Sequence, residues 1–104
     1  MLVKEIVVMK KLGWVDIFID ILESAITPEN KTRLMYKSNL YFARFNAYFY
    51  DFLRKGLLEE TDVNEDEIVY VTSERGKTLL ASLKEAERIF SEVPARPLLP
   101  ALAK

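Results

Sequence analysis

The sequence predicts an α+β fold that is mainly helical and ends in a long C-terminal helix. Apolar side chains recur at helical spacing from Trp14 and again from Phe42. Two short runs rich in β-branched residues lie between Leu57 and Ser73, and helical spacing then returns up to Glu92. With 104 residues, half of them hydrophobic, the chain fits one domain with a modest core, and an oligomerising extension would help to stabilise it.

The composition excludes several classes of function. The chain has no cysteine and no histidine, which excludes disulfides, thiolate or imidazole metal sites, cysteine nucleophiles and a Ser-His-Asp triad. Asp16 and Asp20 lie one helical turn apart and form an acidic face with Glu23, but no further convergent group or glycine-rich phosphate loop accompanies them. We interpret this face as solvated surface and expect no enzymatic activity, no cofactor and no metal site.

The N-terminal residues give the weakest pattern. Val3, Ile6 and Val8 favour a strand over residues 1–11, although the segment can also extend the helix that follows. Lys4 and Lys10 are among the charges that interrupt this apolar run, so it does not read as a signal peptide or a transmembrane span. We therefore expect a cytoplasmic protein without a membrane partner.

The first clear helix starts at Trp14. One face carries Trp14, Ile17, Phe18, Ile21, Leu22 and Ala25. Val15, Ile19 and Ile26 widen that face beyond the need of a small three-helix core. Two interpretations stay open: the helix is buried on two sides, or Val15 and Ile19 meet a second subunit. Thr27 and Pro28 end the helix, since proline breaks its hydrogen bonding.

The segment Lys31–Glu60 combines the densest positive charge with the densest aromatic cluster, and it predicts two helices joined by a turn. Residues 31–55, called the basic segment below, hold six basic residues and one acid, a net charge of +5 in a chain of net charge −1. The basic residues are Lys31, Arg33, Lys37, Arg44, Arg54 and Lys55, and the acid is Asp51. The basic segment is therefore strongly positive, although the chain as a whole is slightly negative.

The shorter helix of this pair should begin after Asn30, whose side chain can cap free amide groups, and should carry Leu34 and Met35 inward. Ser38 and Asn39 make the turn. The longer helix is predicted over Phe42–Lys55. Its core face carries Phe42, Phe45, Phe49, Phe52 and Leu53, and its opposite face carries Ala43, Arg44, Ala47, Asp51 and Arg54. Gly56 follows as a helix-ending glycine.

Two strands, Leu57–Thr61 and Ile68–Ser73, are predicted next, with the polar turn DVNEDE between them. Acids crowd the end of this hairpin: Glu59, Glu60, Asp62, Glu65, Asp66 and Glu67. One interpretation is a solvated hairpin that charge keeps from edge-to-edge association. The other is that the acids serve a partner other than a phosphate backbone.

The last helix is predicted from Ser73 to Glu92. Leu79, Leu83, Ala86, Phe90 and Val93 have the spacing of a coiled-coil seam. A helix of about 20 residues spans about 30 Å, so its C-terminal half should project past the body and need a second chain. The predicted dimer interface comprises Leu83, Ala86, Ile89, Phe90 and Val93. Prolines at 94, 97 and 100 favour an extended tail over residues 94–104.

Three stretches, KTRLMYKSNL, FLRKGLLEE and VYVTSERGKTLL, resemble the small archaeal winged-helix DNA-binding proteins. The resemblance covers roughly Trp14 to Val93. It implies a winged helix-turn-helix body over residues 1–72 with a wing at about 57–73, and a dimerisation helix over 73–93 that forms a coiled coil in some relatives. The family's Leu-Thr-Glu-Lys-Gly pattern before the last helix is one residue longer here, over Val71–Gly76.

The resemblance also implies a function, as a homodimeric transcriptional regulator or nucleoid-associated architectural protein that inserts the helix Phe42–Lys55 into the major groove of double-stranded DNA. Tyr41 and Arg44 would lie nearest the bases. The full expected DNA-binding set is Lys31, Thr32, Arg33, Lys37, Ser38, Tyr41, Ala43, Arg44 and Ala47. Ala43 and Ala47 can touch a thymine methyl but donate no hydrogen bond. The alternative is a protein-interaction module that binds DNA weakly or not at all and uses the acidic wing.

Overall fold

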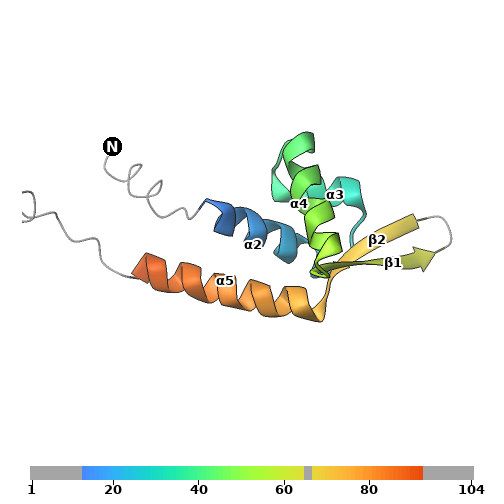
Figure 1. The fold of residues 1–104 in the computed structure, drawn as a ribbon. Helices are drawn as coiled ribbons and strands as arrows, with labels where there is room; N and C mark the ends of the chain where they lie inside the picture. The colour runs from blue at the N-terminus through green and yellow to red at the C-terminus, as the bar shows by residue number, and fades with distance from the viewer. Residues whose placement is uncertain (1–12, 65–66, 93–104) are drawn as a thin grey trace, which may run out of the picture.

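A computed structural model describes residues 13–64 and 67–92 of the chain. Over these residues it contains four helices and one two-stranded antiparallel sheet, which confirms the predicted mainly helical α+β fold with a long C-terminal helix (Figure 1). The elements are α2 (Trp14–Ser24), α3 (Lys31–Ser38), α4 (Phe42–Arg54), β1 (Leu58–Asn64), β2 (Glu67–Thr72) and α5 (Glu74–Glu92). The predictions for residues 1–11, Val93 and the tail 94–104 fall outside the described residues.

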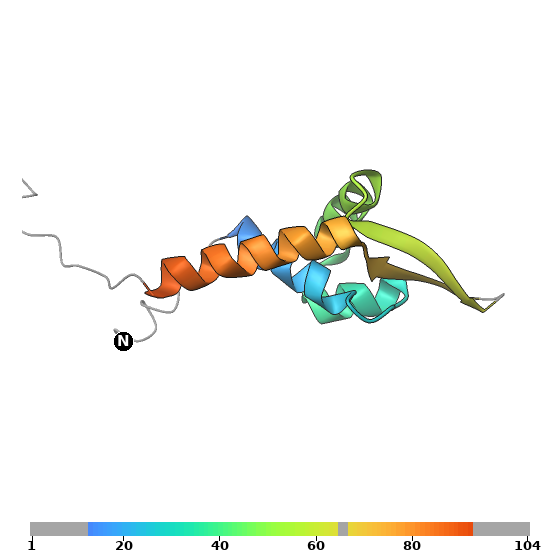
Figure 2. The same ribbon diagram turned by 90° about the horizontal axis from the view of Figure 1, so that it is seen from below.

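The last helix, α5, runs back beside α2, and the two helices pack against each other (Figures 1 and 2). Val15 and Ile19 of α2 are only 8% and 6% exposed, and they share one buried cluster with Leu80 and Leu83 of α5. The interpretation that Val15 and Ile19 meet a second subunit is therefore wrong, because the chain buries them in its own core. The interpretation of α2 as a helix buried on two sides is confirmed.

The centre of the core is aromatic and is built on α4. Phe45, Phe49 and Phe52 are at most 1% exposed. Phe18 of α2 lies edge-on to Phe52 with ring centroids 4.8 Å apart, and Phe49 lies edge-on to Tyr70 of β2 at the same separation. Edge-to-face pairs add about 0.5–1.5 kcal/mol to the burial of their area, so these rings join α2, α4 and the hairpin.

Two aromatic residues predicted for the core are exposed instead. Trp14 is 56% exposed and Phe42 is 64% exposed, although each lies on the helical face that becomes buried one turn later. Each is the first residue of its helix. The apolar period fixes the direction in which such a side chain points, but a neighbouring element must also reach that end of the helix to cover it.

The hairpin extends further than its composition predicted. Register pairs run from Leu58 with Thr72 to Asn64 with Glu67, and an irregularity lies between Asp62 and Asn64. Polar residues expected in the turn therefore belong to the strands, and the turn is shorter than the six residues proposed. The hairpin extends away from α2 and α5 (Figures 1 and 2).

Hydrogen bonds at the end of β2 fix where α5 begins. Thr72 Oγ1 donates to the carbonyl oxygen of Leu22 at 2.7 Å, and Thr72 N donates to that of Ala25 at 2.8 Å. Ser73 follows, and its hydroxyl oxygen accepts a hydrogen bond from Gly76 N at 3.0 Å, as the side chain of an N-cap residue does. Ser73 thus caps the last helix.

An acidic cluster lies where α5 passes α2. Hydrogen bonding with Asp16, partial burial and the negative charges of Asp16, Asp20 and Glu23 all raise the pKa of Glu87 above its ordinary value. Lys84 forms an ion pair with Glu23 at the same contact. The acidic face predicted on the first helix is therefore not only solvated surface, because it faces charged side chains of α5.

Candidate nucleic-acid interface

Asparagines flank both ends of α3, and the second one begins the turn to α4. Asn30 caps the helix by accepting a hydrogen bond from Arg33 N at 2.9 Å, as predicted. Asn39 ends it in the left-handed conformation, with φ of 61°, which asparagine tolerates better than most residues. The chain thus reverses within a few residues and presents the N-terminus of α4.

Ser38 is the last residue of α3 and is buried. It is 2% exposed, and its hydroxyl donates to the carbonyl oxygen of Leu34 at 2.7 Å. This geometry corrects the expectation that Ser38 contacts DNA, because a buried hydroxyl with a bonded proton is not available to a phosphate. It also moves Ser38 from the turn into the last turn of α3.

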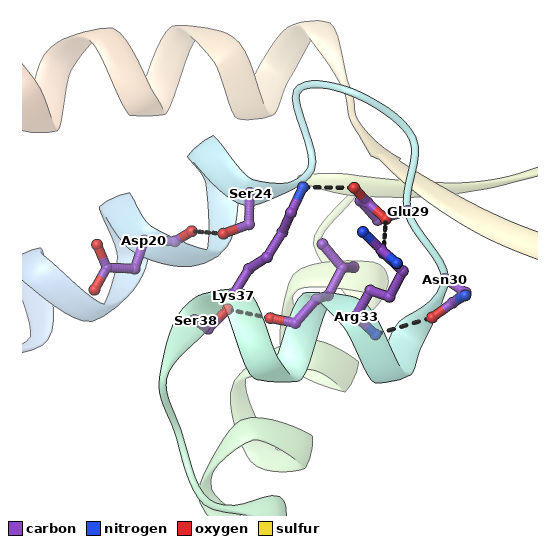
Figure 3. A network of polar contacts seen from close by, with 8 residues as sticks. Asp20, Ser24, Glu29, Asn30, Arg33, Lys37 and Ser38 are labelled. Atoms are coloured by element: carbon purple, nitrogen blue, oxygen red, sulfur yellow. Dashed lines mark hydrogen bonds and ion pairs between the residues drawn. The ribbon is translucent and has the colours of Figure 1, made fainter.

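Glu29 forms ion pairs with two cationic side chains of α3. Its carboxylate pairs with Arg33 at 3.0 Å and with Lys37 at 2.5 Å (Figure 3). Hydrogen bonding from Lys37, followed by the positive charges of Lys37 and Arg33, lowers the pKa of Glu29 below its ordinary value. The carboxylate is therefore ionised at neutral pH, and both cations predicted to contact phosphate are already paired with an acid.

Glu29 is also fixed to the hairpin through its backbone. Glu29 N donates to the carbonyl oxygen of Tyr70 at 3.1 Å, and Tyr70 N donates to that of Glu29 at 2.8 Å. Glu29 is a site residue outside the predicted set. It lies before the N-cap of α3 and not in the helix, so helical spacing gave no signal of its pairing with Arg33.

Lys31 is held against α4. Its ammonium donates to the hydroxyl of Tyr50 at 2.9 Å and lies 4.7 Å from the centroid of the Tyr50 ring and 5.3 Å from that of Phe49. A cation over aromatic faces is stabilised by about 0.5–1 kcal/mol at exposed sites. Tyr50, 47% exposed, is a second site residue that the sequence analysis missed.

The two cations at the C-terminal end of the basic segment are also paired. Asp51 accepts from Arg54 at 3.3 Å and from Lys55 at 3.0 Å. The Lys55 hydrogen bond is the largest cause of the lowered pKa of Asp51. Over residues 13–64 and 67–92, no acidic side chain pairs with Arg44, so it carries the uncompensated charge of the predicted DNA-reading face.

The other predicted contacts of α4 lie on the exposed side of the helix. Tyr41 is 88% exposed, and Ala43, Arg44 and Ala47 are exposed as well. Thr32 of α3 is also exposed. These residues are therefore exposed on or next to α4, and Thr32, Arg33 and Lys37 are exposed on the preceding helix.

The predicted dimer interface on α5 divides into two parts. Leu83 is 7% exposed and belongs to the core of its own chain, which corrects its assignment to a contact between chains. Ala86 is exposed, and Ile89 and Phe90 are 49% and 47% exposed. Val93 lies outside the described residues.

The hairpin carries acids along its length. Glu59, Glu60, Asp62 and Glu67 are exposed, while Glu65 and Asp66 lie outside the described residues. Glu67 accepts a hydrogen bond from the Asn30 side chain at 3.2 Å, so the hairpin contacts the start of α3.

Comparisons with known proteins support the winged helix-turn-helix fold. The winged helix-turn-helix family matches residues 13–91. The crystal structure of Sso10a-2, a DNA-binding protein from Sulfolobus solfataricus, is similar with a TM-score of 0.65 and 25% sequence identity, covering 74% of this chain and 80% of that chain. No curated protein matches the chain. Among the described helices, none is long and apolar enough to cross a membrane.

Proposed function

Because the chain belongs to the winged helix-turn-helix family, we propose that it binds double-stranded DNA through the exposed face of α3 and α4. One observation carries the proposal: Arg44 stands exposed and without an acidic partner among the described residues, on the side of α4 opposite its buried phenylalanines. The similarity to Sso10a-2, a DNA-binding protein, supports the same partner.

In this proposal α4 enters the major groove with its N-terminal end first, as the second helix of such motifs does. Arg44 reads a guanine through its two-pronged guanidinium, while Ala43 and Ala47 can contact thymine methyl groups. Thr32, Arg33 and Lys37 hold the phosphate backbone beside the groove, and Lys31 supports them from the side of Tyr50. Whether the bound protein regulates transcription or organises DNA depends on its target sites.

Replacing Arg44 by alanine should relax sequence preference, because a bidentate contact to guanine contributes about 1–3 kcal/mol of discrimination. Arg33→Ala and Lys37→Ala should instead weaken binding to all sequences alike and reduce the slope of log affinity against log salt by about 1 each at most. Mobility-shift titrations of a preferred and a scrambled duplex at two salt concentrations would measure both quantities.

Arg75→Ala is the matched control, since Arg75 is an exposed arginine at the start of α5 and outside the proposed face. It should change neither preference nor slope appreciably. Unchanged affinity and preference in Arg44→Ala, with the control behaving identically, would overturn the proposed reading by α4.

Glu29→Gln should tighten non-specific DNA binding. The change removes the charge that pairs with Arg33 and Lys37 but keeps the backbone groups that bond to Tyr70. Two released cations should steepen the salt slope by up to about 2, since each neutralised phosphate adds about 0.9.

The control for Glu29→Gln is Glu74→Gln, which removes the same formal charge from the start of α5, where Glu74 pairs with Lys77. Its salt slope should match that of the unchanged chain. An equal gain in both variants would mean that overall net charge, and not release of the α3 cations, determines the affinity.

We further propose that the chain acts as a homodimer joined through the C-terminal half of α5. Ile89 and Phe90 leave about half of their surface open, and two-chain packing of such a stripe follows the spacing of a coiled-coil seam. Phe90→Glu should convert a dimer into a monomer in light scattering, whereas Ala81→Glu, at an exposed position nearer the start of α5, should not. An unchanged chain that is already monomeric at high micromolar concentration would contradict the proposed homodimer.

The exposed acids of the hairpin support a second candidate, a protein-interaction module. Glu60 and Asp62 lie on one face of β1 and Glu59 on the other, and this exposed negative charge repels phosphate and suits a basic partner. This candidate takes the place of DNA binding if Arg44→Ala leaves DNA affinity unchanged while neutral substitutions at these acids abolish binding to a protein.

A further inference from the structure

A hollow of about 450 Å³ lies where α3 turns into α4, and three of its six lining residues are aromatic. It is lined by Met35, Tyr36, Asn39, Leu40, Tyr41 and Phe42 and is called the aromatic hollow below. Tyr36 is 72% exposed, Tyr41 88% and Phe42 64%. Three rings open to solvent within seven residues are costly to leave exposed, and reading a duplex does not use their faces, because paired bases are stacked on each other.

Positive charge borders the aromatic hollow. A smaller hollow of about 130 Å³ adjoins it through Met35 and Phe42 and is also lined by Lys31 and Thr32. The Lys31 ammonium lies 5.9 Å from the centroid of the Phe42 ring. No acidic residue is among those that line either hollow.

We propose that the aromatic hollow binds unpaired bases of a single-stranded nucleic acid. Bases stack on the rings of Tyr36, Tyr41 and Phe42, and Lys31 holds an adjoining phosphate. This pairing of aromatic faces with a cation is what single-strand binding requires, since stacking tolerates any base and the groove must follow a polyanion. An acidic peptide would use the cation without the ring faces, and a neutral apolar segment would leave the cation without an anionic partner.

The proposed single-strand and duplex contacts share Lys31 but differ at Tyr36. The Tyr36 ring lies on α3 and has no part in the proposed duplex contacts. A single strand therefore competes with duplex DNA for the chain, while substitutions at Tyr36 separate the two activities.

The test measures fluorescence anisotropy of a labelled short oligothymidylate, an abasic strand of equal length and a duplex, each titrated with the full chain. The oligothymidylate should bind more tightly than the abasic strand, which keeps the phosphates but offers no ring to stack. Tyr36→Ala should weaken oligothymidylate binding about five- to 100-fold, the range of one lost stacking contact. Its binding to the duplex should stay within about twofold of the unchanged chain.

Tyr36→Trp restores a stacking ring and should recover oligothymidylate binding, whereas Trp14→Ala removes an exposed aromatic residue of α2 and should leave it unchanged. Equal affinity for the abasic strand and the oligothymidylate would overturn the inference and leave only electrostatic attraction. An equal loss of duplex and single-strand binding in Tyr36→Ala would also overturn it. Failure of duplex binding alone would count against the proposed function while leaving the aromatic hollow intact.

Discussion

Phe49→Ala is expected to lower the free energy of unfolding by about 3–5 kcal/mol, the usual cost of truncating a buried phenylalanine. Phe49 is fully buried, stacks on Phe45 with centroids 5.3 Å apart and lies edge-on to Tyr50 and Tyr70 at 5.1 Å and 4.8 Å. Truncation opens a cavity between α4 and the hairpin. In a small domain of about 5–15 kcal/mol total stability, the melting temperature should fall by roughly 10 °C or more.

Phe42→Ala provides the matched control, because Phe42 is the same residue type on the same helix but is 64% exposed. Its effect on thermal melting followed by circular dichroism should be within about 1 kcal/mol. If the two variants melted alike, the burial of the α4 face described above would be contradicted.

Gly76→Ala should destabilise the chain by about 3 kcal/mol or more, at the upper end of overpacking. A β-carbon at this position would lie 2.2 Å from the carbonyl oxygen of Leu57 and 2.7 Å from Thr72 Cγ2. The oxygen belongs to the backbone and cannot rotate away, so α5 must shift from the hairpin. Alanine favours helix over glycine by about 1 kcal/mol, which the clash exceeds.

Ser82→Ala places alanine at an exposed position of the same helix, without such contacts, and should leave stability unchanged or slightly higher. Urea denaturation of both variants gives the two free energies directly. A Gly76→Ala variant that is as stable as the unchanged chain would show that α5 does not approach Leu57 closely in solution.

Much of the fold was predicted from the periodicity of apolar residues, and the errors of that prediction have a common physical cause. The spacing of Phe45, Phe49 and Phe52 determined which side of α4 is buried. The same spacing placed Phe42 and Trp14 in the core, where neither is found, because a helical period encodes direction around an axis and not how far neighbouring elements reach along it. The close packing of α5 on α2 likewise depends on contacts between distant segments.

The part of the candidate site on α4 could be predicted from the sequence, because the periodicity of one helix shows which of its side chains are exposed. Tyr41, Ala43, Arg44 and Ala47 lie on the exposed side of α4 as expected. The sequence could not show that Arg33 and Lys37 are paired, because their partner Glu29 is brought close by the loop before α3 and by its bridge to β2. Charge counted along the chain therefore overstated the charge available to phosphate.

The ion pairs of Glu29 couple DNA binding to protons. A phosphate that takes Lys37 from Glu29 removes the largest cause of the lowered pKa of that carboxyl, and the phosphate's own charge raises the pKa further. The bound state then has the higher pKa and holds more protons than the free state near the ordinary Glu29 value of 4.5. By linkage, DNA affinity should rise as the pH falls through this range, and Glu29→Gln should abolish that rise.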